Sequence, residues 1–166
     1  MNIEQIINIG KDRQKAHPHG TKRYYKDENK EDVIGIAGEI AFGKLYDLDP
    51  DLEIKPNGDN HIDFNLLIND IKVTIDIKTA QKPFNLLIKK WEIEKCADVL
   101  VLAKYLDIDN IEFIGWTTKK IMKKQPTKVF SSLNIENYYL HHTELFKMKD
   151  LDKLLKREGI KIKQIK

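Results

Sequence analysis

Two aspartates and a lysine in the middle of the chain have the types and spacing of a divalent-metal site. They are Asp63, Asp76 and Lys78, and all three lie between Gly58 and Thr79. Asp76 and Lys78 are two residues apart, so in a strand their side chains lie on one face. Mg²⁺ prefers oxygen ligands from one or two carboxylates and keeps water for the rest of its shell. These residues therefore predict a Mg²⁺ site with a lysine beside it.

The elements that would position these residues are two strands joined by a tight turn. Apolar and polar residues alternate over 62–68 and again over 71–78. This period of two is typical of a strand with one buried face, so Asp76 is expected on the open face. Asn69 and Asp70 can adopt the positive φ angles of a two-residue hairpin turn. The sequence thus predicts an antiparallel hairpin.

The turn also predicts which residues face each other. With Asn69 and Asp70 in the turn, Asp63 lies directly opposite Asp76. Side chains in that relation have Cβ atoms about 4.5–5.5 Å apart, and two carboxylates there repel unless a cation neutralises them. Asp59 is a rival ligand, but it precedes Asp63 by four residues and falls outside the same-face neighbourhood of a strand, so Asp63 is preferred.

These residues carry a resemblance to a known family. Asp63, followed by the run Asp-Ile-Lys at 76–78, resembles the PD-(D/E)XK nuclease superfamily. The chain from about 32 to 145 resembles the small phage and bacterial members of that superfamily. Ile62 stands where the name of the family has proline, at a position where the proline is often absent.

The resemblance implies a fold, a reaction and partners. The fold would be α/β, a single domain with a mixed central sheet flanked by helices, as in restriction endonucleases. Asp63 and Asp76 would bind Mg²⁺, with Mn²⁺ as a substitute, and Lys78 would orient or activate the water that hydrolyses a phosphodiester bond. The partner would be nucleic acid, DNA before RNA, in the cytoplasm of a bacterial or phage-infected host cell. A homodimer is left open.

Two other functions compete with cleavage. A protein could keep the nuclease fold and bind nucleic acid or another protein, as an inhibitor or accessory subunit, without cutting. The chain could also be a structural domain in which Asp76 and Lys78 pair on the surface. The structural domain is disfavoured, because Asp63 and Asp76 would then share Lys78 as their single basic partner.

A helix over residues 29–46 should precede the hairpin and carry a further carboxylate. Asn29 can cap this helix, and Gly35 and Gly38 allow it to lie close against a sheet. Glu39 lies at the edge of the apolar helix, where a carboxylate is costly unless it is paired or exposed. In the resembled family such a helix contributes a glutamate to the site. We therefore prefer Glu39 as a metal ligand over a Glu39 paired with a surface lysine.

Basic and polar residues outside the hairpin are candidates for contact with nucleic acid. The most basic segment is TTKKIMKK, in which Thr117 can cap a short helix. Such lysines neutralise phosphates regardless of base sequence. The alternative for this segment is an ordinary solvated helix face. Together with loop and strand-end residues, the candidates are Arg23, Gln81, Lys82, Lys119, Lys120 and Lys123.

Length and composition fit one globular domain over residues 1–166. Hydrophobic residues make up 41% and charged residues 33%, a balance without the signature of disorder. We expect an N-terminal helix and loop at 1–28 and the hairpin at 61–79. The net charge of +3 is small, so contact with DNA would need local clustering of charge. One cysteine, no long apolar run and no signal-peptide core predict a cytoplasmic protein.

The remaining elements are expected to complete the sheet and its cover. Trp91 is expected to anchor the core. The tail from Gly159 alternates isoleucine with lysine, which indicates an edge strand or a basic extension. Strands are predicted at 85–88, 97–106 and 111–116, and a helix at 149–157.

Overall fold

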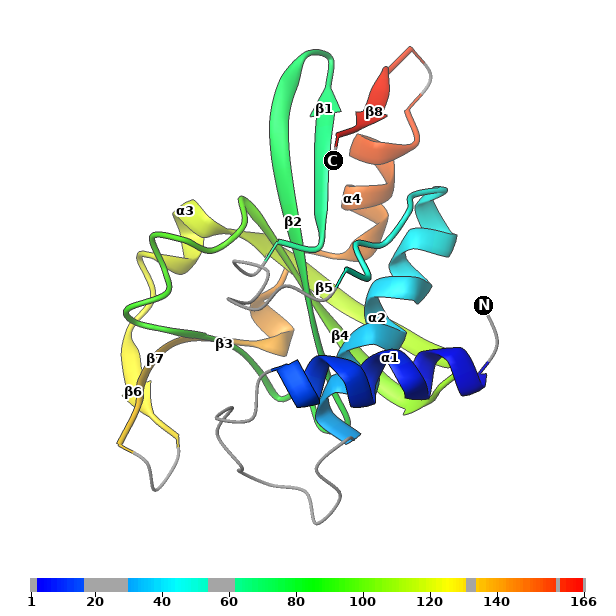
Figure 1. The fold of residues 1–166 in the computed structure, drawn as a ribbon. Helices are drawn as coiled ribbons and strands as arrows, with labels where there is room; N and C mark the ends of the chain where they lie inside the picture. Colours follow the sequence, from blue (N-terminus) through cyan, green and yellow to red (C-terminus); the bar gives the residue numbers. More distant parts are fainter. Residues whose placement is uncertain (1–2, 17–29, 54–61, 131–133, 158, 166) are drawn as a thin grey trace.

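A five-stranded mixed sheet forms the centre of the fold (Figure 1). The computed structural model describes residues 3–16, 30–53, 62–130, 134–157 and 159–165. In the sheet β2 and β4 run parallel, and the other neighbouring strands run antiparallel. The strand order is β5-β4-β2-β1-β8, with β1 at Phe64–Ile68, β2 at Ile71–Ala80, β4 at Val99–Asp107, β5 at Asn110–Thr118 and β8 at Ile162–Gln164.

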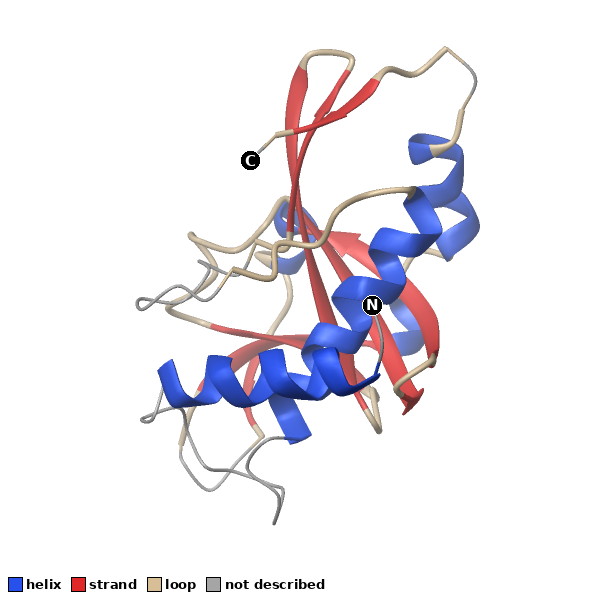
Figure 2. Cartoon of the chain, turned by 45° about the vertical axis from the view of Figure 1, so that its right-hand side comes forward, coloured by secondary structure: helices blue, strands red, loops and turns tan. Residues whose placement is uncertain are grey.

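Helices cover one face of this sheet, which confirms the predicted α/β class. Phe42 of α2 packs with Phe64 and Ile75 of the hairpin, and Leu151 of α4 belongs to the same buried cluster. Figure 2 shows α1 lying across α2. The helices are α1 (Ile3–Ala16), α2 (Lys30–Tyr46), α3 (Lys119–Met122) and α4 (Met148–Leu155), with a 3-10 turn, η1, at His142–Glu144.

A second, three-stranded sheet covers the other face of the central sheet. Its strand order is β3-β7-β6, with β3 at Asn85–Lys89, β6 at Thr127–Val129 and β7 at Glu136–His141. Leu86 and Leu140 from this sheet pack against Leu100 and Leu102 of β4. Asp76 and Lys78 are the partners of these two leucines in register and therefore face the second sheet.

The expectation that Asp76 lies on an open face is therefore wrong. Only 2% of Asp76 is exposed, because the small sheet covers the side of β2 that the alternation left polar. Alternation along a strand predicts which residues lie on the same face. It does not predict whether another layer of the protein covers that face. The aspartate is thus held in a far drier environment than the sequence suggests.

The register of the hairpin is confirmed for the residues that pair. Phe64 lies opposite Ile75, and the ladder continues to the turn. Asn69 and Asp70 have φ angles of 49° and 67°, as a two-residue turn requires. The tail forms β8 and pairs with the outer edge of β1, so its prediction as an edge strand is also confirmed. The other predicted strands and the last helix are present, with shifted ends.

Two local predictions are wrong. Trp91 is 61% exposed, since residues 90–96 form turns in which Ile93 and Cys96 take the buried positions. The residue that caps α3 is Thr118 and not Thr117, because β5 continues through Thr118, whose hydroxyl accepts a hydrogen bond from the N–H of Ile121.

Some predictions concern residues outside the described ranges. These are the capping role of Asn29, the contact role of Arg23 and the rival ligand Asp59. In the described part of the chain, no helix combines the length and the apolar character needed to cross a membrane.

Candidate active site

One pocket brings together the four residues for which the sequence predicts chemistry. The pocket has a volume of about 370 Å³ and is lined by residues of α2, β2 and β3. Glu39, Asp63, Asp76 and Lys78 all line it. They come from a helix, from the start of a hairpin and from its second strand, so only the folded chain assembles this group.

Asp63 lies immediately before β1 and is fixed against β2 by its own backbone and side chain. Its N–H donates to the carbonyl of Ile75 at 2.9 Å, and its carboxylate accepts from the N–H of Ile77 at 2.6 Å. The regular ladder ends at Phe64, so Asp63 meets β2 through these bonds instead of as a ladder partner of Asp76. Asp63 is thus held against β2 as expected for the hairpin, but its predicted place directly opposite Asp76 is not part of the ladder.

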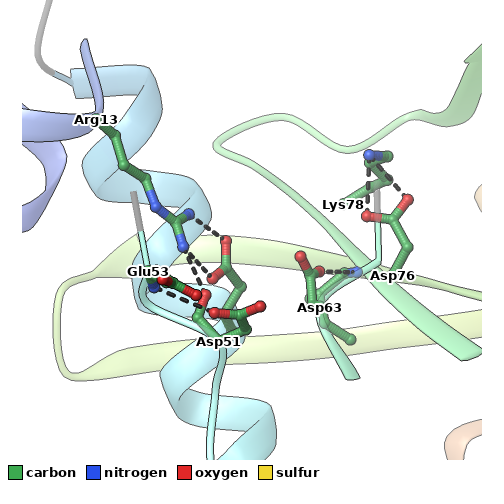
Figure 3. Close-up of polar contacts among 8 residues, drawn as sticks. Arg13, Asp51, Glu53, Asp63, Asp76 and Lys78 are labelled. Carbon is green, nitrogen blue, oxygen red and sulfur yellow. Dashed lines mark hydrogen bonds and ion pairs between the residues drawn. The ribbon is translucent and has the colours of Figure 1, made fainter. Parts of the chain in front are cut away.

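Asp76 and Lys78 form an ion pair along one face of β2. The Lys78 Nζ lies 2.8 Å from Oδ2 and 3.0 Å from Oδ1 of Asp76. The aspartate side chain is 3% exposed, whereas the lysine side chain is 33% exposed. The ammonium group is therefore bonded to a buried carboxylate and is itself partly exposed to solvent. Figure 3 shows the ion pair.

Arg13 is a member of the site that sequence reasoning missed. Its guanidinium donates to both oxygens of Glu39, at 2.9 and 3.2 Å, and to the carbonyl of Asp51 at 2.8 Å. Figure 3 shows Arg13 on the opposite side of Asp63 from Lys78. Glu39 is therefore paired, and its partner is an arginine and not the surface lysine considered as the alternative. No local signal marks Arg13, because its partner is 26 positions away.

The residues that the structure describes give the pocket more acidic than basic groups. Among them, five carboxylates line it, against the side chains of Arg13 and Lys78. Burial raises the pKa of Asp63 well above its ordinary value, and the nearby carboxylates of Glu39 and Asp76 raise it further. Lys78 and the N–H of Ile77 act in the opposite direction. A cation bound near Asp63 would favour its ionised form.

Gly38 explains how α2 approaches β2 so closely. A Cβ added at Gly38 would lie 1.9 Å from the Oγ1 of Thr79, so no larger residue fits without movement. This contact places the next residue, Glu39, beside the strand that carries Asp76. Gly35 behaves differently from the prediction, since no atom lies within 4 Å of a Cβ added there. Gly35 instead lines the pocket.

The donor set fits a hard divalent cation held by few protein ligands. Within the ranges that the structure describes, no three His, Cys, Asp or Glu side chains form a ready-made metal cage. Mg²⁺ does not need one, because it commonly takes one or two carboxylates and retains several waters. Asp63 and Asp76 supply two buried carboxylates in one pocket, and Glu39 supplies a third at its wall.

Of the predicted nucleic-acid contacts, the five that the structure describes do not line the pocket. Lys119 donates to the carbonyls of Glu94 and Cys96, and Lys123 pairs with the Glu94 carboxylate at 2.7 Å. These two lysines therefore hold the turn between β3 and β4 in place. Lys120 is exposed on α3, and Gln81 and Lys82 follow the end of β2 without lining the pocket.

Comparison with known proteins gives no assignment. No family model, no curated protein and no solved structure matches the chain. The resemblance to the PD-(D/E)XK superfamily therefore stays a prediction, carried by the residues of the hairpin and by Glu39.

Proposed function

We propose that this protein is a Mg²⁺-dependent nuclease that hydrolyses phosphodiester bonds in nucleic acid, with DNA favoured over RNA. The observation that carries the proposal is the shared pocket of Glu39, Asp63, Asp76 and Lys78. Carboxylates that hold a hard cation, beside an ammonium that reaches solvent, suit a phosphate bearing negative charge.

Each residue has a separate role in the proposed reaction. Asp63 and Asp76 would hold Mg²⁺, and Glu39 would do so directly or through a water. Bound Mg²⁺ stabilises charge on the phosphate and lowers the pKa of a bound water. Lys78 donates hydrogen bonds, so it can hold the attacking water or a phosphate oxygen. The water oxygen bonds to phosphorus as one bridging P–O bond breaks, which leaves a phosphate end and a hydroxyl end.

A second function has one observation in its favour. Arg13 pairs with Glu39, and Lys78 pairs with Asp76, so protein cations already offset two of the carboxylates. A protein that binds nucleic acid or another protein without cutting could keep such a pocket as a structural feature. This accessory or inhibitor role is the alternative to cleavage.

Cleavage assays with a matched variant test the proposal. Linear, circular, single-stranded and branched DNA, and RNA, are incubated with Mg²⁺, with Mn²⁺ or with a chelator. We expect metal-dependent cleavage that Asp76→Asn reduces by roughly 100-fold or more, since the loss of an electrostatic group at the reacting centre has effects of this order. Asp109→Asn, an exposed acid in the β4–β5 turn, should leave the rate unchanged. Cleavage that survives Asp76→Asn would reject this site, and binding without any cleavage would favour the accessory role.

A further inference from the structure

We infer that the outer face of the β3-β7-β6 sheet binds a single strand of nucleic acid and leads it to the candidate active site. The inference rests on the proposed function, because it names the form of nucleic acid that would reach that pocket. The outer face is defined by side chains that alternate with the buried Leu86, Ile88 and Leu140 or lie opposite such side chains, namely Asn85, Leu87, Lys89, Lys128, Asn137 and Tyr139.

The burial pattern identifies this face. Leu86, Ile88 and Leu140 pack into the buried cluster below the small sheet, so the residues that alternate with them lie on the other side. In register, Leu87 lies opposite Tyr139. Lys128 of β6 extends the same face, since it lies opposite Asn137. Three strands thus present one continuous surface.

The outer face is continuous with the candidate active site. Asn85 and Leu87 line the pocket that holds the carboxylates. A second pocket, of about 260 Å³, is lined by Leu87, Lys89 and Asn137. Lys78 lines both pockets, as does Leu87. Residues of the outer face and Lys78 therefore line the same two pockets, which places a chain bound on this face next to Lys78.

The side chains on this face favour bases as well as phosphates. Leu87 is 37% exposed and lies opposite Tyr139, whose ring meets Phe130 edge-on at 5.2 Å between centroids. Aromatic rings on an open sheet stack bases. The amide nitrogen of Asn137 donates to the carbonyl of Ile135, which leaves its Oδ1 to accept from a base edge. A duplex keeps its bases stacked inside, so these groups suit a single strand.

The distribution of charge supports the same face. The six residues that define it include two lysines and no carboxylate. Lys89 pairs with Glu92 at the rim, at 2.7 Å. Among the described residues, Lys128 lies over the Phe130 ring at 5.6 Å and makes no ion pair. Lys119 and Lys123, by contrast, are bonded to the β3–β4 turn. Lys128 is therefore better placed than the lysines of α3 to neutralise a phosphate.

Binding without metal tests the inference apart from cleavage. Fluorescence anisotropy follows a labelled DNA strand of about 12 nucleotides, alone or as a duplex, in chelator and low salt. We expect tighter binding of the single strand. Lys128→Glu should weaken that binding by about tenfold and lower its salt dependence. The matched control is Lys163→Glu, which makes the same charge change on β8, another three-residue strand, at the far end of the molecule (Figure 1).

Substitutions at Tyr139 test stacking. Tyr139→Phe keeps the ring and should retain nearly full affinity, whereas Tyr139→Leu should weaken binding of the single strand roughly fivefold or more. Thermal unfolding shows whether the leucine variant is folded. Lys128 is exposed, so its substitution tests the face whatever happens at Tyr139.

The outcomes separate this inference from the proposed function. Equal effects of Lys128→Glu and Lys163→Glu, or tighter binding of the duplex, would overturn the inference. Single-strand binding lost in Lys128→Glu, in a protein that cuts no substrate, would support the face and reject the nuclease. If the protein cleaves in a metal-dependent way but Lys128→Glu leaves single-strand binding unchanged, the result would support the nuclease function and reject the binding role of the outer face.

Discussion

The guanidinium of Arg13 is bonded to both carboxylate oxygens of Glu39, at 2.9 and 3.2 Å, from a helix outside the predicted site. Both side chains are largely buried, with exposed fractions of 15% and 7%. A buried carboxylate is destabilising without a hydrogen-bonded cation. Arg13 therefore stabilises the buried carboxylate of Glu39 when no metal is bound. Helix α1 is thereby part of the site.

Arg13→Ala should destabilise the metal-free protein by roughly 3 kcal/mol, because it breaks a buried ion pair and leaves the acid in place. Urea denaturation in chelator measures the loss. Mg²⁺ should raise the stability of this variant more than that of the wild type, since a bound cation compensates for the missing guanidinium. Lys15→Ala, which breaks an exposed pair with Asp12 in the same helix, should cost less than about 1 kcal/mol. Equal losses in the two variants would contradict a buried pair.

Glu39→Gln should weaken Mg²⁺ binding by roughly 10- to 100-fold, the range found when a group supporting a metal site is lost. Titration of Mg²⁺, followed by thermal stability and by any cleavage, measures the shift. Glu31→Gln is the matched control, because Glu31 is an exposed acid of α2 that lines the same pocket. If both substitutions shift the Mg²⁺ requirement equally, Glu39 acts only through the general charge of the pocket.

Asp63→Asn should stabilise the metal-free protein, although it removes a proposed metal ligand. The raised pKa of Asp63 means that the folded state holds a proton which the unfolded state loses above about pH 4. Stability therefore falls as pH rises from about 4 through the raised pKa, and asparagine removes this dependence. The amide oxygen can still accept from the N–H of Ile77.

Melting temperatures in chelator measure this effect. The variant should melt at least about 2 °C above the wild type at neutral pH, the shift that roughly 1 kcal/mol gives a chain of this size. The difference should be smaller at about pH 5 than at about pH 8. A gap that is constant with pH would show that the ionisation of Asp63 is not its cause.

Two glycines of α2 provide a contrast in packing. Gly38→Ala should destabilise the protein by about 1–3 kcal/mol, because the new Cβ would collide with Thr79 and push the helix off β2. Gly35→Ala should stabilise it by about 0.5–1 kcal/mol, since its Cβ meets no atom and alanine favours the helix. Urea denaturation compares them. A stable Gly38→Ala variant would mean that α2 does not lie this close to β2.

The hairpin and its register could be predicted because their signals are local. Asn69 and Asp70 adopt the turn that their types favour, and the alternation on each side fixes the pairing from Phe64 onward. The approach of Gly38 to a sheet was predictable for a similar reason. A residue without a side chain in a buried helix leaves room for close packing.

The parts that could not be predicted depend on distant contacts. Arg13 has an ordinary place in an amphipathic helix, and only the crossing of α1 over α2 brings it to Glu39. The residues around Asp76 also give no sign that the small sheet covers this aspartate. The sequence indicates that Lys119 and Lys123 are charged. It does not indicate that they bond to the carbonyls of Glu94 and Cys96 and to the Glu94 carboxylate.

The pairing of β1 with β8 has a consequence for the timing of assembly. Leu66 pairs with Gln164 in the ladder between β1 and β8. The outer edge of β1 therefore stays unpaired until the ribosome has synthesised β8. Until then its backbone groups lack ladder partners and can pair with another nascent chain. Contacts of such long sequence separation also form slowly. The strand that follows Asp63 therefore keeps an open edge, which can misassemble, until β8 has been synthesised.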